Sequence, residues 1–270
     1  MKVWFITGTS KGFGRIWAEA ALNRGDRVVA TARDAATLDD VVTKYGANVL
    51  ALALDVTDRA AVFDAVRRSH QHFGRLDIVI NNAGYGQFGA VEELSEAEAR
   101  AQMETNLFGA LWVTQAALPI LRAQGSGHII QVSSIGGITA FPNIGMYHAS
   151  KWALEGISQS LSLEVAQFGI KVTLVEPTGY STDWGGPSAK RTTPLPAYQP
   201  TREASANRWK GRQRGRPEAT APVMLKLVDM ADPPLRIFFG KETVEMAHAE
   251  YAKRLAEWDA FKALSEEAHG

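Results

Sequence analysis

The sequence predicts an α/β fold, a single domain over residues 1–270 with a parallel, doubly wound sheet of seven strands and helices on both faces. Seven runs of four to six residues are almost continuously apolar, as is typical of strands covered on both faces. Longer segments with a helical period separate these runs, and this alternation favours right-handed crossovers between parallel strands. The runs lie at residues 3–6, 27–32, 49–54, 77–80, 128–132, 171–175 and 235–239.

Two of the intervening segments show their helical period clearly. The segment after the first run carries an apolar stripe and stops at Gly25, which can adopt the left-handed conformation that ends a helix. The segment before the fourth run has a stripe of the same kind. The stripe residues are Ile16, Trp17, Ala20 and Ala21 in the first helix, and Val62, Phe63, Val66 and Phe73 in the second.

The composition narrows the functional classes. The chain has 29 basic and 29 acidic residues, a formal net charge of zero and no cysteine. The lack of cysteine excludes a disulfide framework, a thiolate metal site and a cysteine nucleophile. Neutrality argues against attraction of the whole surface to nucleic acid or an anionic membrane, and no apolar run has the roughly 20 residues of a membrane span. We therefore expect a soluble, cytoplasmic protein with no metal, no nucleic-acid partner and no membrane partner.

Two segments depart from the strand–helix alternation. Residues 183–222 contain prolines and glycines without a clear period, so we predict a substrate-binding lid there. Within it, residues 185–216 carry eight Lys or Arg and one acid. This stretch is either a solvated loop paired with an acidic tail, or a region that favours an anionic substrate or the cofactor phosphates. Residues 242–268 are predicted to form an amphipathic helix packed against the core or a partner subunit.

A glycine-rich turn follows the first strand directly and leads into a helix. Gly8, Gly12 and Gly14 have the spacing Gly-x-x-x-Gly-x-Gly. Glycines at such positions let the chain turn tightly and let a pyrophosphate approach main-chain N–H groups at the positive end of a helix. The turn therefore predicts a dinucleotide-binding fold of the Rossmann type. Its predicted cofactor contacts are Gly8, Ser10, Lys11, Gly12, Phe13 and Gly14.

The end of the second strand indicates which dinucleotide is bound. An acid at that point usually holds the ribose of NAD, but this strand ends in Ala32 and is followed by Arg33. The guanidinium of Arg33 can bind a 2′-phosphate through two hydrogen bonds, and Lys11 adds a second positive charge. Asp34 is interpreted as the N-cap of the next helix. The sequence therefore favours NADP(H) over NAD(H).

Four polar side chains have a spacing that suits proton transfer. Tyr147 and Lys151 are four residues apart at the start of a helical segment, so both project from one face. Ser134 follows the fifth strand, where the carboxyl ends of the strands gather around a ligand crevice. Asn106 stands in another helix. His148 adjoins Tyr147, and we interpret it as a bystander at the crevice.

Together with Asn-Asn-Ala-Gly at residues 81–84, these motifs resemble the short-chain dehydrogenase/reductase superfamily over about residues 3–184. The resemblance implies that Tyr147 is the general acid in carbonyl reduction, or the base in alcohol oxidation. It implies that Lys151 binds the nicotinamide ribose and lowers the pKa of the phenol, because a nearby cation favours the phenolate. It further implies that Ser134 holds the substrate oxygen and that Asn106 carries a water-linked proton path to Lys151.

The resemblance also implies cofactor contacts beyond the glycine turn. Asp55 and Val56 would contact the adenine, and Thr182 would bind the carboxamide. The family has Pro-Gly where this chain has Pro177-Thr178, and the branched Thr178 side chain either narrows the pocket or is tolerated with a small backbone adjustment. The implied contacts are Arg33, Asp55, Val56, Asn82, Ala83, Gly84, Tyr147, Lys151, Pro177, Thr178 and Thr182.

The most concrete function that these observations predict is NADPH-dependent reduction of a ketone or aldehyde, a reversible reaction. The alternatives are an NAD-dependent alcohol dehydrogenase and a non-catalytic regulatory protein that senses NADP. The family implies a homodimer or homotetramer that pairs through helices near residues 95–122 and 147–168. Because ligand pockets are mostly apolar, the substrate pocket is predicted to be lined by Ser134, Phe141, Met146, Tyr147, Thr178 and Trp184.

Overall fold

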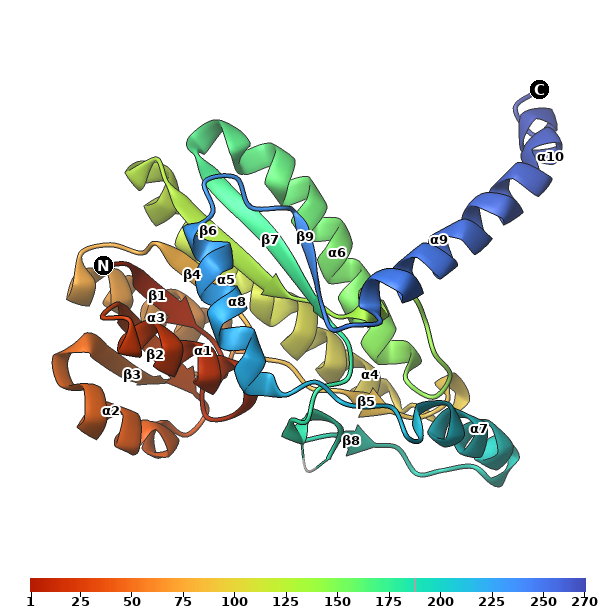
Figure 1. Ribbon diagram of the computed structural model, residues 1–270, viewed down its shortest axis with the longest axis horizontal. Helices are drawn as coiled ribbons and strands as arrows, with labels where there is room; N and C mark the ends of the chain where they lie inside the picture. Colours follow the sequence, from red (N-terminus) through yellow and green to blue (C-terminus); the bar gives the residue numbers. More distant parts are fainter. Residues whose placement is uncertain (187) are drawn as a thin grey trace.

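A computed structural model describes residues 1–186 and 188–270 and contains one seven-stranded parallel sheet in the order β3-β2-β1-β4-β6-β7-β9 (Figure 1). The order changes direction between β1 and β4, because the chain first moves outward to β3 and then returns to the other side of β1. The predicted fold class is therefore confirmed. The strands are β1 (Val3–Ile6), β2 (Arg27–Ala32), β3 (Val49–Ala53), β4 (Ile78–Asn81), β6 (Gly127–Val132), β7 (Ile170–Pro177) and β9 (Arg236–Phe239).

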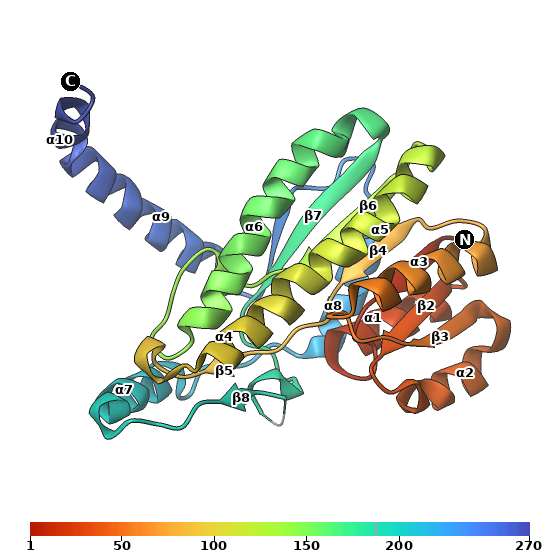
Figure 2. The same cartoon turned by 180° about the vertical axis from the view of Figure 1, so that it is seen from behind.

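Helices cover both faces of this sheet, and alternate strand residues meet them. In β1, Trp4 and Ile6 pack with α1, α2 and α8, whereas Val3 and Phe5 pack on the opposite face with α3, α5 and α6 (Figure 2). This alternation follows from the two-residue side-chain period of a strand. The helices are α1 (Gly12–Asn23), α2 (Asp39–Tyr45), α3 (Arg59–Phe73), α4 (Glu96–Met103), α5 (Gly109–Gln124), α6 (Gly145–Val165) and α8 (Thr220–Asp229).

The basic segment 185–216 contains regular structure that its sequence does not reveal. Its first part forms β8 (Lys190–Arg191), which pairs in parallel with β5 (Gln87–Phe88), and its later part forms α7 (Gln199–Trp209). The sequence shows no clear period here, so it predicted a lid but none of these elements. Helix α7 has no buried residue and so shows no apolar stripe. It is held instead by an ion pair of Arg202 with the buried Glu93 carboxylate, at 2.6 Å.

The C-terminal segment forms two helices, α9 (Thr243–Ala260) and α10 (Lys262–Glu267), where one had been predicted. Figure 1 shows α9 leaving the body of the molecule and α10 at its far end. The buried residues of α9 are Thr243 and Ala247 in its first turns, and further along Glu250 and Arg254 bond Thr139 and Ile138. The large apolar side chains beyond Ala247 are 47–63% exposed, so these side chains do not pack on the chain's own core, the first of the two predicted alternatives. These side chains are Tyr251, Leu255, Trp258, Phe261 and Leu264.

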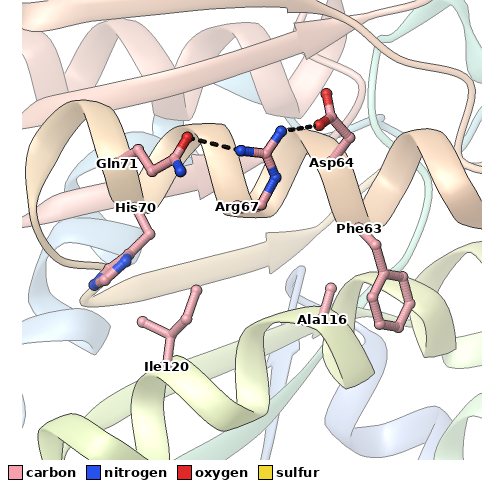
Figure 3. A pocket seen from close by; sticks show the side chains of 7 residues that line it. All are labelled: Phe63, Asp64, Arg67, His70, Gln71, Ala116 and Ile120. Carbon is pink, nitrogen blue, oxygen red and sulfur yellow. Dashed lines mark hydrogen bonds and ion pairs between the residues drawn. The ribbon is translucent and has the colours of Figure 1, made fainter.

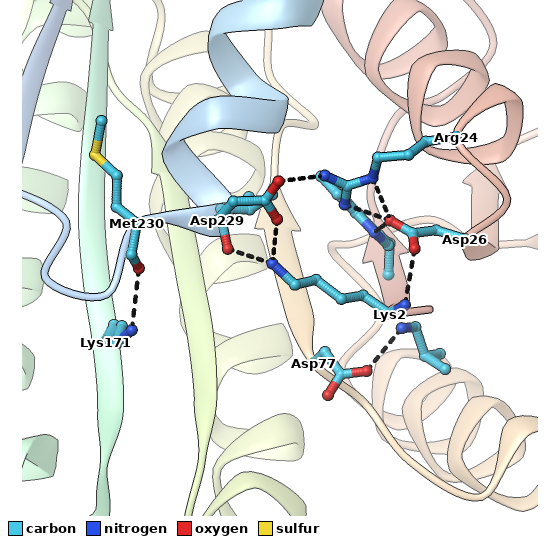
Figure 4. A network of polar contacts seen from close by, with 10 residues as sticks. Lys2, Arg24, Asp26, Asp77, Lys171, Asp229 and Met230 are labelled. Atoms are coloured by element: carbon cyan, nitrogen blue, oxygen red, sulfur yellow. Dashed lines mark hydrogen bonds and ion pairs between the residues drawn. The ribbon is translucent and has the colours of Figure 1, made fainter.

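A polar network ties the start of β1 to the ends of two helices (Figure 4). The buried carboxylate of Asp26 accepts hydrogen bonds from the Lys2 amide at 2.8 Å and from the Trp4 indole at 2.9 Å, and it also pairs with Arg24. Asp229, at the end of α8, pairs with both Lys2 and Arg24. Although burial opposes ionisation, these hydrogen bonds keep the pKa of Asp26 below its ordinary value.

We expect Asp26→Ala to lower the free energy of unfolding by about 1–3 kcal/mol, because buried donors lose their acceptor. A carboxyl with a lowered pKa stabilises the fold above its unfolded pKa of about 3.9, and this contribution disappears as the pH falls through the folded value. The difference between variant and wild type in urea unfolding should therefore shrink below about pH 4. As the control, Asp64→Ala removes an exposed pair with Arg67 and should cost about 0–1 kcal/mol. Equal losses in the two variants would contradict this account.

Candidate active site at the carboxyl edge of the sheet

A cavity of about 1590 Å³ opens along the carboxyl edge of the sheet. Its wall is made by the turns after β1, β4, β6 and β7, by the first turns of α6 and by the basic segment. Parallel strands bring these turns together because all of their carboxyl ends lie at the same edge. Most sequence-predicted site residues line this cavity. The exceptions are Gly14, Asn106 and Met146.

The glycine turn forms a cradle in which side chains would be in the way. Gly8 and Gly12 have φ angles of +70° and +61°, a region that favours glycine. A Cβ on Gly14 would lie 2.4 Å from the Gly8 carbonyl oxygen, so Gly14 packs beneath the turn rather than in the cavity wall. Asn82 holds the turn in place, since its Nδ2 donates to the carbonyl oxygens of Thr7 at 2.8 Å and Gly8 at 3.0 Å. A dinucleotide pyrophosphate fits this cradle at the start of α1.

The end of the cavity next to β2 is basic. Arg33 lines it and has no ion pair with any residue that the structure describes. Asp34 turns its carboxylate to its own backbone and accepts a hydrogen bond from the Ala36 amide at 3.0 Å, as its predicted N-cap role requires. Lys11 also lines the cavity and pairs with Asp183 of the lid at 3.4 Å. Asp55 and Val56 lie in the wall at this end of the sheet.

The turns after β4 and β7 form the middle of the wall. The amides of Asn82 and Ala83 both donate to the Thr7 hydroxyl, at 2.9 and 3.0 Å. Gly84, Pro177 and Thr182 line the cavity as well. The methyl group of Thr178 is accommodated by Gly240, where a Cβ would lie 2.7 Å from Thr178 Cγ2 and where φ is +123°.

Tyr147 and Lys151 lie on the first turns of α6, 7% and 6% exposed. The Lys151 ammonium donates to the Val132 carbonyl at 2.7 Å and lies 5.7 Å from the centre of the Tyr147 ring. Burial raises the pKa of Tyr147 to about 12, although a hydrogen bond with Ser134 opposes the shift. Burial lowers the pKa of Lys151 to about 8, against the charge of Glu155. In the chain by itself burial thus outweighs the nearby cation, and the phenol keeps its proton at neutral pH.

Ser134 lies in the cavity wall, whereas Asn106 lies behind it. Ser134 lines the cavity, and its hydroxyl accepts a hydrogen bond from the Gly136 amide at 3.0 Å. Asn106 lies in a π-helical turn (Glu104–Phe108) behind the cavity wall, where its side chain bonds both backbone groups of Tyr85 and the Ser150 hydroxyl. A Cβ added to Gly84 would lie 3.1 Å from Asn106 Oδ1 and 3.8 Å from Lys151 Nζ. Asn106 therefore approaches Lys151 from behind the turn after β4.

Aromatic side chains from residues 183–222, the predicted lid, cover the side of the cavity next to Tyr147. The ring of Trp184 lies 4.9 Å from that of Tyr147 and 5.6 Å from that of Phe88. Phe141 contacts Trp209 of α7 at 5.3 Å between ring centres. Phe88 and Ile144 also line the cavity and were missed by the sequence prediction. Residues 88–89 and 144 are joined by an isolated backbone bridge at Gly89, a contact that local periodicity does not reveal.

A buried acidic pair lies on α6 and at the end of β7. Glu155 is one turn after Lys151, and Glu176 is the next-to-last residue of β7; Arg236 reaches both, at 2.9 and 3.5 Å. One cation cannot neutralise two buried carboxylates, so burial and the charge of Glu155 raise the pKa of Glu176. Glu176 thus carries a proton at neutral pH.

We expect Glu176→Gln to reduce the loss of stability between about pH 5 and 8. In wild type the unfolded chain releases this proton above about pH 4.3 while the folded chain retains it, so stability falls as the pH rises. The glutamine has no proton to release. Urea unfolding across this pH range measures the slope, and Glu266→Gln on the exposed helix α10 should keep the wild-type slope. A Glu176→Gln slope equal to that of wild type would show that the carboxyl is ionised.

A second, open hollow of about 550 Å³ lies on the outer surface between α3 and α5 (Figure 3). Arg67 lies along α3, bonded to Asp64 and, at 2.9 Å, to Gln71 of the same helix. Phe63 and Ile120 contribute its apolar floor. None of its lining residues belongs to the large cavity, and among the described residues no group of His, Asp or Glu has the arrangement of a metal site.

Comparison with known proteins agrees with this geometry. A glycine cradle beside a buried Tyr–Lys pair, on a doubly wound parallel sheet, defines an oxidoreductase that binds a nicotinamide dinucleotide. A family model described as short chain dehydrogenase matches residues 2–192. The chain belongs to the short-chain dehydrogenase/reductase family. No helix in the described part of the chain is long and apolar enough to cross a membrane.

Three similar proteins illustrate the relationship. Oxidoreductase BOA17 of Botryotinia fuckeliana is 47% identical over 250 residues, which cover 91% of each chain. A crystal structure of a short-chain dehydrogenase from Streptomyces avermitilis has a TM-score of 0.91 and 37% identity, covering 99% of this chain and 100% of that one. An alcohol dehydrogenase from Thermococcus sibiricus, complexed with 5-hydroxy-NADP, has a TM-score of 0.75 and 26% identity, covering 88% and 96%.

Proposed function

We propose that the protein reduces a ketone or aldehyde to an alcohol at the expense of NADPH, with Tyr147 as the proton donor. The observation that carries the proposal is the buried Tyr147 phenol, which keeps its proton at neutral pH and lies beside a cavity with a dinucleotide cradle. A group that must deliver a proton to a carbonyl oxygen needs to hold that proton at the working pH.

The roles of the neighbouring side chains follow from their positions. Bound NADPH supplies the hydride in this chemistry. Ser134 faces the same cavity and can donate its hydroxyl hydrogen to the carbonyl oxygen while Tyr147 transfers its proton to that atom. Lys151 stabilises the phenolate that remains, because its ammonium lies 5.7 Å from the ring centre, and its lowered pKa makes it a ready proton source. Asn106 positions the turn after β4 next to Lys151.

The choice of NADP rests on charge. Arg33 is free of ion pairs among the described residues and lies where the second strand ends without an acid. A guanidinium there can bind the 2′-phosphate that distinguishes NADP from NAD. The Thermococcus sibiricus relative, which was solved with an NADP derivative, is consistent with this choice.

The same proposal includes assembly and location. Family members commonly form oligomers, and we infer a homodimer or homotetramer. The apolar floor of the hollow between α3 and α5 and the exposed apolar face of α9 support this inference. We place the protein in the cytoplasm, as its cysteine-free, neutral sequence led us to expect.

We expect Tyr147→Phe to lower kcat for carbonyl reduction by about 10²–10⁴-fold, because the proton donor is lost. NADPH binding, measured by fluorescence of the reduced nicotinamide, should change by less than about threefold, because the ring remains in place. Tyr45→Phe, which removes an exposed hydroxyl on α2, is the matched control and should retain full turnover. Substantial turnover by Tyr147→Phe would exclude Tyr147 as the donor.

We expect Arg33→Ala to raise KM for NADPH by about 10–100-fold, the effect of losing charge-assisted hydrogen bonds worth about 1.5–3 kcal/mol. KM for NADH should stay within about twofold of wild type, because that cofactor lacks the 2′-phosphate. Arg68→Ala, on the outer surface of α3, serves as the control for loss of a positive charge. A parallel change in KM for both cofactors would contradict the assignment.

A further inference from the structure

His148, a bystander by its sequence position, is buried and makes two hydrogen bonds to one loop. The residue follows Tyr147 on α6 and is 6% exposed. Its Nδ1 lies 2.8 Å from the Gly136 carbonyl oxygen, and its Nε2 lies 2.9 Å from the Phe141 amide nitrogen. The imidazole therefore bridges residues 134–141, called the serine loop below because it begins with Ser134.

The two partners determine the protonation of the ring. A carbonyl oxygen can only accept and a backbone amide can only donate, so Nδ1 must carry the hydrogen and Nε2 must be bare. The ring is thus neutral, and burial lowers the pKa of His148 in agreement with this geometry. A second ring proton would set two donors against each other at Phe141.

The first residues of the serine loop connect the His148 ring to the Ser134 hydroxyl. Gly136 lies between the two side chains, because its carbonyl accepts from His148 Nδ1 and its amide, which belongs to the preceding peptide group, donates to the Ser134 hydroxyl at 3.0 Å. The fit is close. A Cβ on Gly136 would lie 2.8 Å from His148 Nδ1 and 3.3 Å from Ser134 Oγ, so a displacement of the ring moves the peptide that holds the hydroxyl.

The last residue of the serine loop, Phe141, connects the His148 ring to the cavity wall. Phe141 lines the cavity, and its ring packs edge-on against Trp209 of α7 at 5.3 Å. Arg208 of α7 lies over the same ring at 5.5 Å. The Phe141 amide donates to His148 Nε2 and the two rings lie 5.5 Å apart, so His148 links α6 to this aromatic contact through both its hydrogen bond and its ring.

We propose that His148 is a positioning residue that aligns, through the serine loop, both the hydroxyl of Ser134 and the aromatic wall at Phe141. The inference rests on the proposed carbonyl reduction, in which Ser134 holds the substrate oxygen. The middle of the loop is anchored separately, since Arg254 of α9 donates to the Ile138 carbonyl at 2.9 Å and Thr139 donates to Glu250 at 3.3 Å. Loss of His148 thus disturbs alignment at the two ends while the loop stays attached.

The two hydrogen bonds of the His148 ring can be removed separately by substitution. An asparagine amide takes the place of Nδ1 and can still donate to Gly136, whereas a glutamine amide oxygen takes the place of Nε2 and can still accept from Phe141. We expect His148→Leu to lower kcat by about tenfold or more and to raise KM for the carbonyl substrate by about threefold or more. His148→Asn should recover mainly kcat, and His148→Gln should recover mainly KM.

The chain contains a matched control. His128 on β6 is equally buried, 4% exposed, and its Nε2 bonds the Thr173 hydroxyl at 2.9 Å, away from the cavity. His128→Leu should lower thermal stability and leave kcat and KM within about twofold of wild type. Values of kcat and KM in His148→Leu that also stay within about twofold of wild type would overturn the proposal.

A second measurement needs no substrate. In wild type, ¹⁵N NMR of the histidine ring should show the hydrogen on Nδ1, and the Phe141 amide should exchange slowly with solvent. In His148→Leu and His148→Asn that amide should exchange about tenfold faster or more, while His148→Gln should protect it. If wild type reduces no carbonyl compound, the proposed function fails. The positioning role of His148 is then tested only by the exchange rate of the Phe141 amide. A Phe141 amide that exchanges at the same rate in wild type and His148→Leu overturns it.

Discussion

Because all seven strands of the central sheet run in the same direction, their carboxyl ends meet at one edge, and the chain must return across a face after each strand. These crossovers cover both faces and bury β1 completely. The strand order reverses direction between β1 and β4, so the turns after these two strands diverge from one another. Asn82, in the turn after β4, then holds the glycine turn after β1 from the side. The site depends on this arrangement before any catalytic side chain is considered.

Burial at that edge also shifts the pKa values of four ionisable side chains. Tyr147 and Glu176 have raised pKa values and Lys151 and His148 have lowered ones, in each case because burial disfavours the charged form. The chemical consequences differ. The phenol, whose ordinary pKa already keeps it protonated at neutral pH, holds its proton more firmly, the lysine gives up its proton more readily, and the imidazole is a neutral bridge between two backbone groups. One physical cause thus acts on the phenol, its cationic neighbour and the neighbouring imidazole.

The basic segment 185–216 gains its structure from acids elsewhere in the chain. Arg202 pairs with Glu93 before α4, Arg212 pairs with Glu242 at the start of α9, and Lys11 of the glycine turn pairs with Asp183 just before the segment. The pair with Glu242 agrees with one of the two alternatives for the basic segment, the one in which it pairs with the acidic tail. The neutral total charge is therefore a balance between segments, and part of it is realised as these ion pairs. The exposed pairs Arg212–Glu242 and Lys11–Asp183 contribute little energy singly, whereas Arg202 binds a buried carboxylate. Trp184 and Trp209 add aromatic contacts at the cavity.

The sequence by itself determined the sheet and the cradle. Continuous apolar runs and a glycine turn are local patterns, and they led to the strands, the fold class and a dinucleotide-binding turn because burial on both faces and positive φ angles restrict which residues can occur. The tertiary structure alone decided what depends on distant partners. Helix α7 has no apolar stripe, α9 leaves the body after its first turns, and Asn106 lies behind the wall. The role of His148 is of the same kind, because hydrogen bonds to Gly136 and Phe141 arise from how a loop folds back over a helix, and no residue spacing encodes that contact.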